Sequence, residues 1–161
     1  MDSRPPPREH LDPRARTLWR LSALVQTVPM VLLTLAAVAL LVRLDRVPLL
    51  LAVVVAVAVL AVAVVTVWTV PDLVWRRWRY DIGETEVDLQ HGWLTVTRTL
   101  IPMTRVQHVD TRRGPLQRRF GLASVVLFTA AGASEIPALA DAVADAARDR
   151  IAALANVQED L

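Results

Sequence analysis

Histidine and serine are the residue types here that could supply acid, base or nucleophilic chemistry, and the chain has few of either. The histidines and serines are His10, His91, His108, Ser3, Ser22, Ser124 and Ser134. None of them lies in a nucleophile-elbow, zincin, phosphate-loop or dinucleotide-binding pattern. Cysteine is absent, which excludes disulfides, thiolate metal ligands and cysteine nucleophiles. We therefore expect no catalytic site, no metal site and no cofactor.

Arginine could supply a second kind of chemistry, the recognition of anions. One stretch contains six arginines and a single acid, Asp110; the arginines are Arg98, Arg105, Arg112, Arg113, Arg118 and Arg119. These side chains could contact anionic lipid headgroups, since each base near an anionic surface contributes about 1 kcal/mol. In the competing interpretation, which we favour, Arg118 or Arg119 pairs with Asp110 or with the acidic run between Asp81 and Asp88. The basic region would then only stabilise the fold.

The distribution of charge argues against nucleic acid as a partner. The chain of 161 residues has a formal net charge of +2. From residue 76 onward, eleven arginines are balanced by eleven acids. Nucleic-acid-binding domains normally carry a clear basic excess on one face.

Two long apolar runs indicate how the chain is anchored. The residues from Leu49 to Val70 and those from Leu21 to Val42 contain no charge over twenty-two positions each. A helix of that length rises about 33 Å, enough to cross a hydrocarbon layer of about 30 Å. We therefore predict two transmembrane helices, with a kink at Pro29. Gln26 lies within the first helix, where packing against the other helix competes with a transport role.

The short connection between the runs predicts a tight helical hairpin, and the arginines around it predict its orientation. Eight arginines lie near the outer ends of the hairpin, whereas Arg43 and Arg46 lie in the turn; the eight are Arg4, Arg8, Arg14, Arg16, Arg20, Arg76, Arg77 and Arg79. The positive-inside rule then places both termini in the cytoplasm of an inner-membrane protein. Residues 1–20, which are polar and proline-rich, are predicted to form a disordered cytoplasmic tail.

The remaining residues, 76–156, have the pattern of a small α+β domain. Apolar positions alternate and turn residues recur, which predicts short strands. The predicted strands are 79–82, 86–91, 93–101, 105–112, 124–129 and a short one at 135–136. From Leu139 to Ala155 the apolar spacing becomes helical, so one amphipathic helix is expected to close the domain.

The stretch from Leu100 to Gly132 resembles the bacterial pleckstrin-homology (PH) domain family, in particular the small YdbS-like membrane proteins. The matching pieces are IP at Ile101 and Pro102, RVQHVDT at 105–111, GPL at 114–116, RRFGLA at 118–123 and TAAG at 129–132. Two amino-terminal spans ahead of one such domain also fit that family. The motif residues that we expect to be mostly structural are Pro102, Gln107, His108, Asp110, Gly114, Pro115, Phe120 and Gly121.

The resemblance implies a fold and a kind of function. The fold is a membrane α-helical hairpin followed by a PH-like bent antiparallel β-sandwich or barrel, capped by a carboxy-terminal helix. The function is that of a non-catalytic interaction or scaffold module in a membrane protein assembly. Its expected partners are the lipid bilayer and either another membrane protein or further copies of the chain. The alternative is a reader of anionic lipid headgroups through the basic region.

Overall fold

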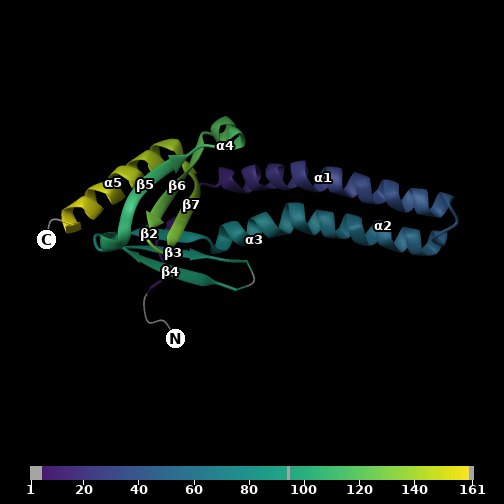
Figure 1. The fold of residues 1–161 in the computed structure, drawn as a ribbon, viewed down its shortest axis with the longest axis horizontal. Helices are drawn as coiled ribbons and strands as arrows, with labels where there is room; N and C mark the ends of the chain where they lie inside the picture. Colours follow the sequence, from purple (N-terminus) through teal and green to yellow (C-terminus); the bar gives the residue numbers. More distant parts are fainter. Residues whose placement is uncertain (1–4, 94, 160–161) are drawn as a thin grey trace. The chain divides into compact units, whose positions relative to one another are not determined.

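The computed structural model describes residues 5–93 and 95–159 and divides into two compact units (Figure 1). Residues Trp19–Leu73 form one of them, which we call the membrane unit. The other, the β unit, combines Met1–Leu18 with Val74–Leu161.

Helices α1 (Arg14–Arg43) and α2 (Leu49–Val64) are the main elements of the membrane unit. A π-helical turn, η1 (Val65–Thr69), and helix α3 (Val70–Arg77) continue the second helix without a break. The two helical stretches have mean hydropathies of 2.3 and 3.2 and are long enough to cross a membrane.

The side chains of the membrane unit suit lipid rather than water. Large apolar residues project outward; Leu50, Leu33 and Met30 are exposed by 78%, 73% and 72%. Each such side chain left in water forgoes about 1.5–3 kcal/mol of hydrophobic stabilisation, whereas lipid tails solvate it. The predicted helical hairpin is confirmed, and its turn follows Arg43, with Asp45 at a positive φ of 52°.

Both helices extend further than the charge-free runs predicted. The first begins at Arg14 instead of Leu21, and the second continues beyond Val70 to Arg77. Pro71 lies within this continuation because the preceding turn is widened: the Val70 N–H donates to the Val65 carbonyl in the i to i+5 pattern. A proline ring clashes with the carbonyl four residues earlier in a regular helix, and a π turn is one way to relieve that clash.

Two antiparallel sheets make up most of the β unit. The first has the strand order β1-β2-β3-β4, and the second has the order β5-β6-β7. The first sheet contains β1 (Glu9–His10), β2 (Arg79–Ile82), β3 (Glu86–His91) and β4 (Thr97–Pro102). The second contains β5 (Val106–Arg112), β6 (Leu122–Thr129) and β7 (Gly132–Ala140). A short 3₁₀ turn, η2 (Met103–Arg105), joins the sheets, and α4 (Pro115–Phe120) connects β5 to β6.

The core of the β unit is centred on β6. Every residue from Leu122 to Leu127 is buried, and successive side chains in a strand point to opposite faces, so both faces of this strand are covered. The carboxy-terminal helix α5 (Asp141–Glu159) packs on β5 and β6 and buries Ala144, Ala147 and Ile151 (Figure 1). The predicted PH-like arrangement of strands capped by a helix is therefore confirmed.

Some strand limits differ from those predicted from the alternation of apolar and polar residues. Strands β2 and β3 have the predicted limits, but β4 begins at Thr97 because the residues before it form the hairpin tip. Strand β7 is nine residues long, since the predicted short strand and the start of the predicted helix belong to it. Ala138, with a positive φ of 51°, lies in β7 opposite a register irregularity of β6.

The amino-terminal segment differs most from the sequence prediction. Residues 5–20 were expected to be disordered, but β1 pairs with β2, and Leu11 and Ala15 are buried to 1% and 0% exposure. An oxygen of the Asp12 carboxylate accepts the Arg14 N–H at 2.8 Å, with Pro13 between them, so Asp12 caps the start of α1. This segment is ordered by long-range contacts, which the local composition does not reveal.

Candidate functional site

Arg98 and Arg113, two of the six arginines, are held by carboxylates. On β4, the Arg98 guanidinium binds Asp88 of β3 with an Nη2 to Oδ2 distance of 2.6 Å, and both side chains are largely buried. Arg113 lies 3.0 Å from Asp141 and 2.8 Å from Asp145, at the start of α5. These contacts raise the pKa of Arg113, chiefly through its hydrogen bond to Asp141. Both arginines therefore stabilise the fold by joining neighbouring elements.

The other four arginines are exposed on the surface of the β unit. Among the described residues, no carboxylate forms an ion pair with Arg105, Arg112, Arg118 or Arg119. Arg105 precedes β5 and Arg112 ends it, so the two backbones are separated by about 20 Å at the normal strand rise. The six arginines thus do not form one continuous patch.

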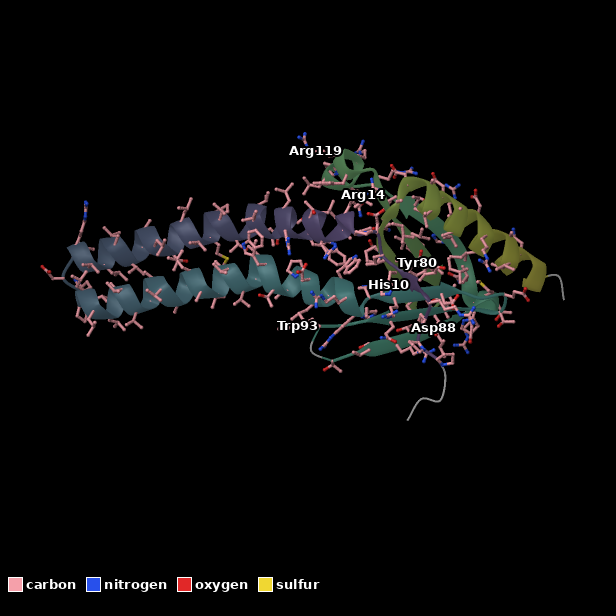
Figure 2. The ribbon with its side chains drawn as sticks, turned by 180° about the vertical axis from the view of Figure 1, so that it is seen from behind. His10, Arg14, Tyr80, Asp88, Trp93 and Arg119 are labelled. Carbon is pink, nitrogen blue, oxygen red and sulfur yellow. The ribbon has the colours of Figure 1, made fainter. Side chains whose placement is uncertain are left out.

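Three of these four exposed arginines lie at the connection between β5 and β6, and we call Arg112, Arg118 and Arg119 the α4 arginines. The Arg112 guanidinium lies 5.5 Å from the centre of the Phe128 ring. Arg118 and Arg119 occupy the last turn of α4, and Figure 2 shows Arg119 on the outer side of that helix. The structure pairs Arg98, and not Arg118 or Arg119, with the acidic run, which differs from the pairing that we favoured.

The motif residues around α4 shape this connection. Gly114 and Pro115 begin the helix, and the Gly114 N–H donates to the Gln117 side chain at 2.8 Å. Gly121 ends it at a φ of 63°, where a residue without a Cβ is favoured. The Phe120 carbonyl accepts a hydrogen bond from Arg14 at 2.9 Å. Helix α4 was predicted only as a turn, although a proline after Gly114 and a glycine six residues later are typical helix limits.

The remaining motif residues lie along β4 and β5. Pro102 ends β4, and Gln107 coincides with a register irregularity between Val106 and His108. The His108 ring stacks on Phe128 with 4.2 Å between centroids. Asp110 is exposed in the middle of β5. Gln107, His108 and Asp110 thus lie on β5, which is an edge strand of its sheet.

The three histidines lie in separate places, each against an aromatic ring. His10 stacks on Trp75, His91 on Trp78 and His108 on Phe128. Within residues 5–93 and 95–159, no group of three or more His, Asp or Glu side chains could hold a metal ion. Each histidine therefore makes a stacking contact with one aromatic ring.

A groove of about 510 Å³ lies between the two helices of the membrane unit. It is lined mainly by small and apolar side chains, together with the polar Gln26, Thr27, Thr34 and Thr66. The hydroxyl groups of Thr34 and Thr66 each donate to a backbone carbonyl of their own helix, at 2.8 Å in both cases. Gln26 is exposed and has no hydrogen-bonding partner for its carboxamide among the described residues. Sequence patterns identified Gln26 but not the groove, which exists only because the helices pair.

The comparisons with known proteins agree with this architecture. A family model described as "Bacterial PH domain" matches residues 23–155, which includes most of α1 and all of α2. The chain is 39% identical over 154 residues to the UPF0699 transmembrane protein YdbS of Bacillus subtilis (strain 168), covering 96% of each chain. It is 29% identical over 90 residues to the UPF0699 transmembrane protein YdbT of the same organism, covering 55% of this chain and 18% of that protein. No solved structure matches significantly. The chain belongs to the bacterial PH domain family of membrane proteins.

Proposed function

We propose that this protein is a non-catalytic interaction module, anchored in the membrane, that joins a membrane protein assembly. In this proposal the groove of the helical hairpin receives a transmembrane helix of another membrane protein. The observation that supports it is the exposed carboxamide of Gln26 on the wall of a groove that otherwise faces lipid.

The depth of Gln26 makes its exposure costly. The apolar run of α1 starts at Leu21, so five residues of helix place Gln26 about 8 Å further along the axis, inside the hydrocarbon. A carboxamide has two N–H donors and one acceptor, and each polar group left unpaired in hydrocarbon costs several kcal/mol. A helix that supplies hydrogen bonds to Gln26 would recover about 0.6–2 kcal/mol.

The rest of the groove suits a helix as its occupant. Ala58 and Ala63 line the wall formed by α2. Small residues let helix backbones approach closely, and this is how transmembrane helices associate when no hydrophobic driving force acts between them. Since Thr34 and Thr66 bond to their own helices, Gln26 and Thr27 are the polar groups left in the lining to fix the register of the partner.

Site-specific crosslinking in native membranes tests the proposal, because the chain has no cysteine of its own. Met30→Cys places a thiol on the groove, and Leu33→Cys is the matched control, since the two side chains are exposed by 72% and 73% but Leu33 does not line the groove. We expect position 30 to give a crosslink to a specific membrane protein and position 33 to give none. Equal yields at both positions, or a product that contains only this chain, would contradict the proposal.

We also propose that both termini lie in the cytoplasm, which would present the β unit to partners there. Eight arginines near the outer ends of the hairpin, against two in its turn, support this orientation. A membrane-impermeant maleimide added to intact cells should label Leu44→Cys, in the turn, and should not label Ala133→Cys, on β7. The reverse labelling pattern would contradict this orientation.

A second candidate function is the recognition of anionic lipid headgroups by the α4 arginines. Their exposure, and the absence of ion pairs to them among the described residues, favour it over pairing within the fold. Full-length protein extracted gently from membranes should then retain anionic lipid, and Arg118→Ala with Arg119→Ala should lower that retention relative to neutral lipid. Arg148→Ala is the control, since Arg148 already pairs with Asp149. Unchanged retention in the double variant would exclude this function.

A further inference from the structure

The tip of the β3–β4 hairpin exposes two large apolar side chains. Trp93 is 54% exposed and Val96 is 50% exposed. Figure 2 shows Trp93 at the end of the hairpin where the two strands are connected. A tryptophan in contact with water gives up much of the stabilisation that its large apolar surface would provide on burial. Its exposure therefore calls for an environment other than water.

The backbone at Gly92 leaves no room for a side chain. Gly92 has a φ of 133°, and a Cβ added there would collide with the carbonyl of Thr95. The Arg77 guanidinium donates a hydrogen bond to the Trp93 carbonyl. The tip is thus held against the end of α3 while the Trp93 side chain remains outside.

The position of Arg77 along the chain relates the tip to the membrane surface. Helix α3 follows the membrane-spanning helix directly, and Asp72 is the first charged residue after Leu49. Five further residues of helix place Arg77 about 8 Å beyond Asp72, and the polar layer on each side of the hydrocarbon is about 5–8 Å thick. A group bonded to Arg77 is therefore near the headgroups.

We propose that Trp93 and Val96 enter the headgroup layer of the same bilayer that anchors the chain. Tryptophan is enriched in this layer, because its ring is apolar and its indole N–H can still donate a hydrogen bond. Arg76, Arg77 and Arg79 lie where the chain leaves the membrane and match the negative charge of anionic headgroups. The tip then fixes the orientation of the β unit at the membrane and acts independently of the helix groove and the α4 arginines.

A pair of threonines at opposite ends of the β3–β4 hairpin allows a matched test. Thr95 lies in the tip, whereas Thr85 lies in the β2–β3 turn, about 20 Å away at the normal strand rise; both are exposed. Each is replaced by cysteine in the full-length chain, labelled with an environment-sensitive fluorophore and reconstituted as one chain per lipid nanodisc. A single chain per disc excludes a protein partner or a second copy as the cause of any protection.

The expected result is a difference between the two positions. The label at residue 95 should be quenched by headgroup-attached quenchers and should be severalfold less accessible to aqueous iodide than the label at residue 85. Adding Trp93→Ser should abolish this difference, with the circular dichroism spectrum unchanged to show that the β unit remains folded. Equal iodide accessibility at residues 85 and 95 would overturn the proposal, and so would protection at residue 95 that persists without Trp93.

Discussion

The membrane unit and the β unit follow opposite rules for what they expose, and each contains a side chain that does not match its surroundings. The membrane unit turns leucine and valine outward, while the β unit buries them around β6. In the membrane unit the exception is Gln26, a carboxamide facing hydrocarbon. In the β unit it is Trp93, an indole facing water. We propose that each exception makes a contact beyond the folded chain, Gln26 with a partner helix and Trp93 with the headgroup layer.

The largest expected effect tests the two rules themselves. Leu127 is fully buried in β6, so Leu127→Ala should lower the free energy of unfolding of the β unit by about 3 kcal/mol. Leu33→Ala removes the same atoms from a lipid-facing position and should leave that free energy unchanged. Thermal unfolding of the two reconstituted variants, followed by near-ultraviolet circular dichroism, measures both. Equal losses would mean that the lipid-facing side chains also form a packed core.

A smaller effect distinguishes a buried from a partly exposed arginine ion pair within the β unit. Arg98→Ala leaves the largely buried Asp88 carboxylate without its partner and should cost about 2 kcal/mol. Arg113 is 37% exposed, so Arg113→Ala should cost about 0.5 kcal/mol in spite of its two carboxylate partners. Chemical denaturation of the two variants gives this comparison. If Arg113 proved the more costly to remove, burial would not be what determines the contribution of these two ion pairs.

Replacing Gln26 removes the exception from the membrane unit. Gln26→Leu should leave the hairpin inserted and the β unit folded, because leucine is well solvated by lipid. It should weaken association with the partner helix by about 1 kcal/mol, a several-fold fall in crosslinking from a cysteine at position 30. Gln26→Asn, which keeps the carboxamide, is the matched control. Unchanged crosslinking in the leucine variant would remove Gln26 from the interface.

The smallest expected effect depends on pH. The hydrogen bond from the Arg14 side chain lowers the pKa of Asp12 below its ordinary value of 3.8. A carboxylate whose pKa is lower in the folded chain than in the unfolded chain stabilises the folded state at pH values above its unfolded pKa. This contribution disappears as the pH falls through the folded pKa. Exchange protection of the β1 amides, corrected for intrinsic rates, should therefore fall as the pH is lowered below 3.8. In Asp12→Asn this step should be absent.

Much of the fold could be predicted from local sequence pattern. The two charge-free runs predict the two membrane helices. The alternation of apolar and polar residues predicts the limits of β2 and β3 correctly to the residue. Strand β1 was missed because its two residues form a strand only when paired with Tyr80 and Arg79. The start of α1 did have a local signal, an aspartate followed by proline, which the polar composition of the segment obscured.

The candidate site was less predictable from the sequence, because it depends on which helices and strands contact each other in the fold. The six arginines looked alike in sequence, yet Arg98 and Arg113 are separated from the others by their contacts with Asp88, Asp141 and Asp145. Gln26 was recognised as unusual, but the groove beside it requires α2. Trp93 was predicted to begin a strand, and its place at an exposed tip follows from the hairpin register.

The most direct test of the account is whether the helix groove is covered in the native membrane. Spin labels at Met30→Cys and Leu33→Cys report how often oxygen dissolved in the hydrocarbon collides with each position. In nanodiscs that hold a single purified chain, both labels should be equally accessible. In native membranes the label at residue 30 should lose most of its accessibility while the label at residue 33 keeps it. Equal accessibility at both positions in native membranes would contradict the account.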